Sequence, residues 1–186
     1  METEIIRHIK QQFYTFRNGM LADRLRSAGD PHNIIFGLNL PQIIDIAGTI
    51  KPCATLAQAL WDNTSTRESQ LIAPMIYPIS EYSEEVANNW IRSITTIEVA
   101  DILCHKLLRY TPFSLAIYNN FITSDNDIER YTALRLAFNL LILNKNIDLQ
   151  QLKEDATNEI TRSNPINIDL AHSMLNEIAS KIDFDK

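Results

Sequence analysis

The sequence predicts an all-α fold, a right-handed α-α superhelix (solenoid) built from HEAT-like helical repeats. Only four of the 186 residues are glycine, and none lies beyond Gly48. A β-sandwich, a barrel or a nucleotide-binding α/β fold needs glycine at its turns, so none of these is expected from Thr49 onward. Short helical patterns instead alternate with polar turns, and successive helix pairs recur at roughly the HEAT or armadillo spacing.

A simple helical bundle is the alternative all-α architecture. Its helices would be longer than the one to two dozen residues indicated here, so the solenoid is favoured. Sequence similarity between successive helix pairs is weak. The predicted repeat therefore rests on the regular spacing of the helix pairs and less on repeated residues. With 45% hydrophobic and 22% charged residues, the chain can bury one substantial core. We therefore expect a single HEAT-like repeat domain over residues 1–186.

The N-terminal region predicts two helices and then a hinge. Apolar residues recur at helical spacing over residues 2–17, and a shorter helix is expected over residues 20–28. An apolar segment then meets Gly37, which we interpret as a hinge. The next helix has Pro41 at its first position, where a missing N–H costs nothing, and Gly48 near its end.

The central region predicts two further helices. Lys51-Pro52 breaks the chain before a helix over residues 55–61. Ser65-Thr66-Arg67-Glu68 has the form of a capping box, with Ser65 at the cap and Glu68 three positions later. The helix that it opens is expected to end at Tyr77-Pro78.

The remaining chain predicts helices separated by short polar turns, and no strand. Thr95 or Thr96 is expected to cap one helix, and Thr111-Pro112 is expected to supply the cap and first residue of the next. The expected ranges are 80–94, 96–110, 112–121, 127–143, 148–161 and 168–182. Trp61 and Trp90 recur with Leu or Ile at helical spacing, so both are predicted in the core.

The charge and the cysteines restrict the class of protein. The net charge of −6 opposes nucleic-acid binding by the chain as a whole, although a local basic stripe is compatible with it. Cys53 and Cys104 are far apart and belong to no metal-ligand cluster, so we expect two buried free thiols in a reducing cytoplasm. The N-terminus is not typical of a signal peptide, and no apolar run is long enough to span a bilayer. We expect a monomer without metal, cofactor or membrane association.

Three segments, taken together, carry a family resemblance. The first is FGLNLPQIIDIA, Phe36–Ala47. The second is LAQALW, Leu56–Trp61, followed by RESQLIA, Arg67–Ala73. The third is WIRSI, Trp90–Ile94, followed by IEVAD, Ile97–Asp101. In order and spacing these segments resemble the DNA alkylation repair glycosylase family, whose members are built from HEAT-like repeats.

The resemblance implies an activity and a partner. Members of the family remove N-alkylated purines from double-stranded DNA, which lies in the concave groove of the solenoid. Electron-rich aromatic rings attract the cationic base, and a fixed carboxylate stabilises the positive charge that develops on the sugar. Unlike base-flipping glycosylases, the family is thought to act without drawing the lesion into a pocket.

The resemblance also assigns roles to individual positions. Asp101 matches the catalytic carboxylate of the family. Ile97 and Ser173 stand where the family has its two groove tryptophans, and Tyr131 stands at the catalytic arginine, with Arg130 beside it. The chain therefore has the carboxylate but neither the tryptophans nor the arginine.

Four further side chains are candidates for binding DNA or a partner: Arg130, Arg135, Tyr131 and His105. The alternatives for the arginines are surface positions or a pair between Arg130 and Glu129. Asp101 and His105 are four residues apart on one helical face, which suits a metal half-site, an acid–base pair or, as we favour, a simple hydrogen-bonded pair.

Two functions are consistent with these patterns. The first is a divergent glycosylase acting on alkylated bases, with Asp101 as electrostatic catalyst. The second is a non-catalytic HEAT-like scaffold that binds DNA or a protein partner in its groove. The absent tryptophans and the acidic balance of the chain favour the second.

Overall fold

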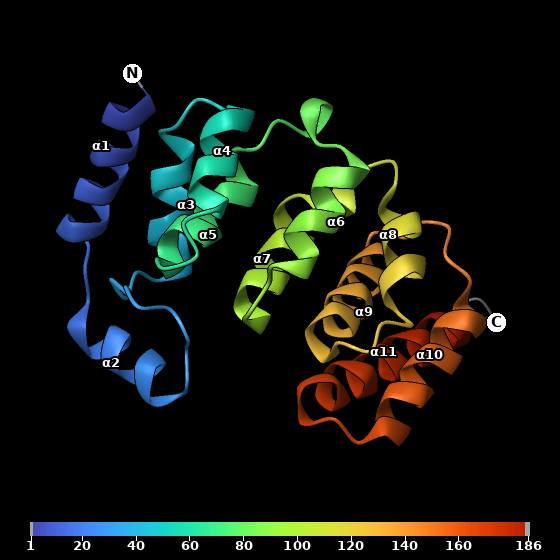
Figure 1. Cartoon of the computed structure of the whole chain (residues 1–186). Coiled ribbons are helices and arrows are strands. Elements are labelled where there is room, and N and C mark those ends of the chain that lie inside the picture. The colour runs from blue at the N-terminus through green and yellow to red at the C-terminus, as the bar shows by residue number, and fades with distance from the viewer. Residues whose placement is uncertain (1, 185–186) are drawn as a thin grey trace. The chain divides into compact units, whose positions relative to one another are not determined.

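The computed structural model describes residues 2–184, which are folded into α-helices and short 3-10 helices (Figure 1). No strand occurs in this range, although Ile34 and Thr66 form an isolated parallel bridge. None of the helices described is both long and apolar enough to cross a membrane. The elements are α1 (Glu2–Thr15), α2 (Gly19–Ser27), α3 (Leu40–Gly48), α4 (Ala54–Trp61), α5 (Arg67–Ile76), η1 (Ile79–Glu81), α6 (Glu84–Arg92), α7 (Ile97–Lys106), η2 (Leu108–Tyr110), α8 (Ser114–Phe121), α9 (Asp127–Ile142), α10 (Leu149–Arg162) and α11 (Pro165–Phe184).

The chain divides into two compact units, one ending at Ser83 and the other beginning at Glu84. The first holds α1 to α5 with η1, and the second holds α6 to α11 with η2. That residues 1–186 form one HEAT-like repeat domain stays a prediction.

In the N-terminal unit, α5 packs against α3 and α4, and α1 packs against α4. Most of the buried side chains between these helices are apolar, as the helical periodicity predicted, although the first turn of α5 also buries polar side chains from Arg67 to Gln70. Trp61 is 2% exposed, which confirms its predicted place in the core. The largest of the other buried side chains are Ile9, Phe13, Leu38, Ile43, Leu60, Leu71, Ile72 and Ile76.

The predicted hinge at Gly37 is held by a buried carboxylate. Glu68 accepts backbone N–H bonds from Phe36 (3.1 Å), Gly37 (2.9 Å) and Leu38 (3.3 Å), and a further bond from Arg67 Nη1 (2.9 Å). The carboxylate is completely buried, and four donors around it compensate for its lost hydration. Glu68 thus fixes the chain that leads into α3.

This role of Glu68 overturns the predicted capping box. The helix begins at Arg67 with Thr66 as its N-cap, and the hydroxyl of Ser65 donates to Asn63 Oδ1. A capping-box glutamate accepts from the backbone N–H of its own cap. The carboxylate of Glu68 is instead occupied by backbone groups some thirty residues earlier in the chain.

The true capping box lies at the start of α3. Asn39 Oδ1 accepts from the N–H of Gln42, and Gln42 Oε1 accepts from the N–H of Asn39, each at 3.0 Å. The helix therefore begins at Leu40, and Pro41 occupies the second position rather than the first. Gly48 is the last residue of α3, as predicted.

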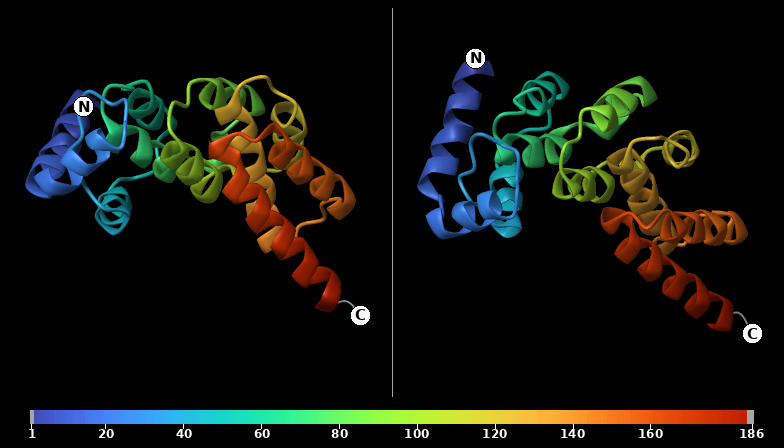
Figure 2. Two further views of the ribbon diagram at one scale, coloured as in Figure 1. Left: turned by 90° about the horizontal axis from the view of Figure 1, so that it is seen from below. Right: turned by 60° about the horizontal axis from the view of Figure 1, so that its bottom comes forward.

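In the C-terminal unit, α9 packs against α7, α8 and α11, and α10 packs against α11. Figure 2 shows α10 and α11 as a connected pair in both further views. Trp90 is 1% exposed, so its predicted core position is also confirmed. Both cysteines are free thiols, as predicted. Cys104 is fully buried, but Cys53 is only half-buried, so its predicted burial is wrong. Burial raises the pKa of the Cys104 thiol, with the charge of Asp101 adding to the effect.

Several helix ends in this unit differ from the prediction. Thr111 Oγ1 donates to the carbonyl of Leu108 instead of capping the next helix, which therefore begins at Ser114. At the other end of the unit, α11 begins at Pro165 rather than at residue 168. Asn164 Oδ1 accepts from the N–H of Ile166 at 2.8 Å, and Pro165 needs no partner in the first turn.

Candidate functional site

Asp101 on α7 meets two side chains of α9. Tyr131 and Arg135 lie one helical turn apart and therefore face α7 together. The Tyr131 hydroxyl donates to Asp101 Oδ1 at 2.8 Å and accepts from Arg135 Nη2 at 3.0 Å. Arg135 Nε lies 2.6 Å from the same Asp101 oxygen as an ion pair, although the N–H is not aligned as a hydrogen bond. The guanidinium also stacks over the Tyr131 ring, 5.7 Å from its centroid.

The electrostatics of this cluster keep Asp101 paired. Burial alone would lower the pKa of Arg135, but the bond with Tyr131 and the charge of Asp101 outweigh it, so the pKa is raised. Burial raises the pKa of Tyr131 to about 12, with Arg135 opposing and Asp101 adding to the rise. At neutral pH Asp101 therefore faces a neutral phenol and a charged guanidinium.

A groove of about 450 Å³ lies beside this cluster, between α7, α9 and α11. We call it the α7–α9–α11 groove. Ile97, Tyr131 and Ser173 all line it, so the structure brings together the three positions that the resemblance assigned to groove residues. None of its lining residues is tryptophan. The sequence reading missed the rest of the lining, namely Phe138, Pro165, Ile166, Asp169 and Leu170, and Arg135 completes it.

Replacing Tyr131 with phenylalanine is expected to reduce the loss of stability at alkaline pH. An unfolded tyrosine ionises near pH 10, but folded Tyr131 has a pKa of about 12. Its contribution to stability is therefore complete below about pH 10 and is lost as the pH rises toward about 12. Urea unfolding at several pH values measures the free energy of unfolding of both proteins. The difference by which the wild type exceeds Tyr131→Phe should shrink across this pH range. A stability difference that is constant from about pH 9 to 12 would contradict the assignment, because other tyrosines affect both proteins equally.

His105 does not pair with Asp101, so the hydrogen-bonded pair favoured from the sequence is wrong. Asp101 lies against Tyr131 and Arg135 instead, and His105 is exposed on the same helix. Burial and the neighbouring charges of Arg109, Lys106 and Arg135 lower the pKa of His105. Among the side chains described, those of residues 4–182, no three from His, Cys, Asp or Glu form a group suited to a metal ion.

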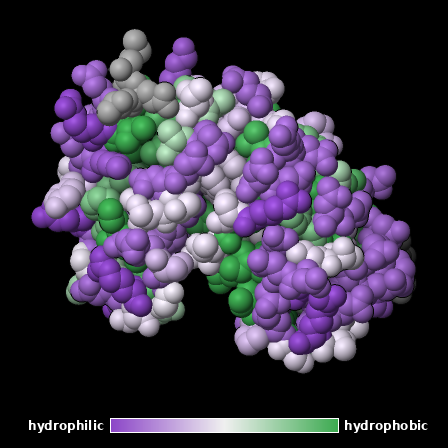
Figure 3. Space-filling model, viewed as in Figure 1, coloured by the Kyte–Doolittle hydropathy of each residue, from purple (hydrophilic) through white to green (hydrophobic). Residues whose placement is uncertain are grey.

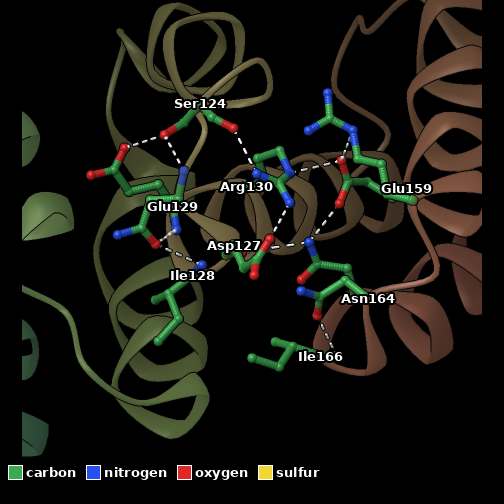
Figure 4. Close-up of polar contacts among 11 residues, drawn as sticks. Ser124, Asp127, Ile128, Glu129, Arg130, Glu159, Asn164 and Ile166 are labelled. Atoms are coloured by element: carbon green, nitrogen blue, oxygen red, sulfur yellow. Dashed lines mark hydrogen bonds and ion pairs between the residues drawn. The ribbon is translucent and has the colours of Figure 1, made fainter.

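Arg130 points into the protein rather than into the groove. Its side chain is 4% exposed, and Nε donates to Glu159 Oε1 at 2.9 Å while Nη1 donates to the carbonyl of Ser124 at 2.7 Å. Nη2 contacts Asp127 as well, and Figure 4 shows the guanidinium between the two carboxylates. Burial opposes the charged form, but the bonds and charges of Glu159 and Asp127 outweigh it and raise the pKa of Arg130.

This buried network argues against the predicted binding role of Arg130. Glu159 Oε2 also accepts from Asn167 Nδ2 at 2.6 Å, so the network joins α9, α10 and α11. The alternative pairing with Glu129 is wrong, because Arg130 pairs with Asp127 and Glu159, and Glu129 accepts from the Ser124 hydroxyl. The donors of Arg130 are used within the fold, and we assign it a structural role.

The comparisons with known proteins agree with this architecture. The model of the DNA alkylation repair enzyme family matches residues 9–165, and the chain belongs to that family. The fold is similar to a solved structure described as "a new family of proteins related to the HEAT-like repeat DNA glycosylases with affinity for branched DNA structures". The TM-score is 0.81 at 17% identity, and the match covers 93% of this chain and 75% of that chain. This likeness confirms the predicted all-α, HEAT-like fold class. No curated protein matches the sequence.

Proposed function

We propose that this member of the DNA alkylation repair enzyme family binds DNA without excising alkylated bases. The observation that carries the proposal is the pairing of Asp101 with Arg135 and Tyr131. A carboxylate that stabilises a positive sugar must present its negative charge to that sugar. Here a guanidinium nitrogen already lies 2.6 Å from Asp101 Oδ1, and the Tyr131 hydroxyl donates to the same atom.

The strength of the ion pair between Arg135 and Asp101 supports the proposal. Two unit charges about 4 Å apart near a protein surface interact with about 4 kcal/mol, so Arg135 cancels attraction of the order that a catalytic carboxylate would offer. Asp101 is 38% exposed on its side chain and Arg135 27%, and solvent screening reduces both interactions together. Relative to an unpaired carboxylate, Asp101 is a weak electrostatic catalyst.

The lining of the α7–α9–α11 groove supports the same conclusion. A cationic base is attracted to the face of an aromatic ring, and tryptophan is the strongest such platform. Ile97 is 46% exposed at the first of the two tryptophan positions, and Ser173 is exposed at the second. Neither side chain has a π face, so an alkylated purine gains no selective attraction at these positions.

DNA remains the favoured partner. The chain belongs to a DNA alkylation repair family, and a structural neighbour has affinity for branched DNA. Positive charge also gathers at the end of α7, where Arg109 and Lys106 are close enough to lower the pKa of His105. Cations at such a surface bind phosphates in a salt-dependent way.

A binding titration tests the DNA-binding half of the proposal. Fluorescently labelled three-way junctions and linear duplexes of equal length are titrated with the protein at low and at physiological salt. We expect binding at low salt that weakens as salt rises, with the junction bound more tightly than the duplex. Absence of binding to either DNA at low salt would refute the proposal. The net negative charge of the chain would then favour the scaffold alternative with a protein partner.

A further inference from the structure

We infer that an exposed row of side chains on α1 and just after its end binds single-stranded DNA. The row consists of Arg7, Lys10, Tyr14 and Arg17, and we call it the α1 row. Successive spacings of three and four residues place Arg7, Lys10 and Tyr14 on one stripe of α1, about 10 Å long. Arg17 follows just after the end of the helix at Thr15. All four are exposed. Figure 3 shows hydrophilic side chains along the edge of the molecule over α1, at the left of the view.

Contacts at the end of α1 bring the aromatic and the last cation of the row together. Arg17 Nη1 donates to the carbonyl of Tyr14 at 3.3 Å, and its guanidinium lies over the Tyr14 ring, 4.7 Å from the centroid. Phe36 meets the same ring edge-on at 5.6 Å. Tyr14 is nevertheless 61% exposed, so most of the ring and the stacked guanidinium are open to a ligand.

The opposite face of α1 anchors the row to the N-terminal unit. Ile9 is 1% exposed and Phe13 is completely buried, and the Phe13 ring packs on Phe36 at 5.6 Å. The centre of the apolar face of α1, at Ile9 and Phe13, is therefore occupied by the core, while Ile5 is 41% exposed. This separates α1 from interfacial membrane helices, whose apolar face must be free to enter the bilayer. The row presents its cations on a fixed helix.

The charge of this segment contrasts with the rest of the chain. Residues 5–22 contain three Arg or Lys residues and no Asp or Glu, so they carry +3 while the remainder carries −9. Within the part of the chain whose side chains are described, Arg7 and Lys10 make no ion pair, whereas Arg26 on α2 is paired with Asp23. The α1 row is thus a cationic surface on an acidic protein, with Glu4 one helical turn before Arg7, and it indicates a polyanionic partner.

The aromatic component selects single strands among polyanions. Proteins that bind single strands combine cations along the backbone with aromatic rings and guanidinium planes on which bases stack. A duplex conceals its base faces, whereas a single strand offers them to Tyr14 and Arg17. The inference rests on the proposed function for the identity of the nucleic acid, since branched DNA presents unpaired segments at its junctions.

A triple substitution tests the cationic part of the α1 row. The row variant is Arg7→Ala with Lys10→Ala and Arg17→Ala, and the control is Lys51→Ala with Lys145→Ala and Lys153→Ala. Both remove three exposed positive charges, so the two proteins have equal net charge. Binding to labelled oligothymidylate is measured by fluorescence anisotropy. The row variant should bind at least about tenfold more weakly than wild type. Its plot of log binding constant against log salt concentration should be shallower, with a slope smaller in magnitude by about 2. The control should stay within about twofold of wild type.

A single substitution tests the stacking part. Tyr14→Ser should weaken oligothymidylate binding by about five- to hundredfold, and Tyr14→Phe should restore most of it, because a base stacks on either ring. Thermal unfolding of both variants is recorded, so that a loss of fold is not mistaken for a loss of stacking. Equal binding by folded Tyr14→Ser and wild type would overturn the stacking role.

The outcomes separate this inference from the proposed function. If the row variant binds oligothymidylate as the control does while all proteins bind the three-way junction, the inference is refuted and the proposed function stands. If wild type binds no DNA of any form at low salt, both fail. Binding of wild type to vesicles containing phosphatidylserine but not to oligothymidylate would also overturn the inference.

Discussion

Substituting Gly37 with alanine is expected to unfold the N-terminal unit. Gly37 has a φ of +77°, a conformation that residues with a Cβ adopt only at a cost. A Cβ placed there would lie 2.2 Å from the carbonyl oxygen of Asn18 and 2.8 Å from the backbone nitrogen of Ala22. Both neighbours are backbone atoms at the start of α2, and the N–H of Gly37 is itself bound to Glu68. Strain and displacement together should cost at least about 3 kcal/mol.

Gly19 provides a matched control for this substitution. It lies in the first turn of α2, and a Cβ there would meet nothing within 4 Å. Gly19→Ala should therefore be neutral or slightly stabilising. Urea unfolding followed by circular dichroism compares the two variants with wild type. Gly37→Ala with an unfolding midpoint equal to that of Gly19→Ala would show that the close approach at Gly37 does not constrain the fold.

Substituting Arg130 with alanine is expected to cause the largest loss in the C-terminal unit. Glu159 is 2% exposed, and removing Arg130 leaves its carboxylate with Arg162 at 3.3 Å and the amide of Asn167. Breaking a buried ion pair by removing one partner costs about 3–5 kcal/mol, because the remaining charge stays desolvated. Exposed Arg24→Ala is the control and should change the free energy of unfolding by less than about 0.5 kcal/mol.

A double substitution distinguishes the electrostatic cause from a loss of packing. In Arg130→Met with Glu159→Leu, neither buried charge remains, and the side-chain volume is largely kept. This protein should recover much of the stability lost in Arg130→Ala, because replacing both partners of a buried pair with apolar residues is often nearly neutral. Denaturant unfolding of the three proteins measures the difference. A double variant as unstable as Arg130→Ala would contradict the stated cause.

The helices could be predicted because their signals are local. Helical periodicity placed every main helix, and the proline-rich and asparagine-rich turns separated them. Errors arose where a side chain had two local options. Thr111 bonds a preceding carbonyl instead of capping the next helix, and Asn164 caps a helix that was expected to begin later. The Glu68 error has a different cause, because its partners at Phe36 to Leu38 lie outside any local window.

The candidate site could be predicted only in part, for the same reason. The resemblance identified Ile97, Asp101, Tyr131 and Ser173, and three of these line one groove while Asp101 lies beside it. Tyr131 and Arg135 lie four residues apart and therefore share one face of α9. Periodicity does not tell which residue of α7 such a face meets, so the pairing of Arg135 with Asp101 required the packed structure. The burial of Arg130 against Glu159, across 29 positions, was hidden in the same way.

The central claim is that Asp101 is too well paired to support base excision in a protein that binds DNA. The most direct test measures release of 3-methyladenine and 7-methylguanine from methylated duplex DNA, at protein concentrations that saturate the DNA in a parallel binding titration. We expect release by wild type equal to that of the protein-free sample and to that of Asp101→Asn. Release by wild type above the protein-free level, and its loss in Asp101→Asn, would establish Asp101 as a working catalytic carboxylate and contradict the claim.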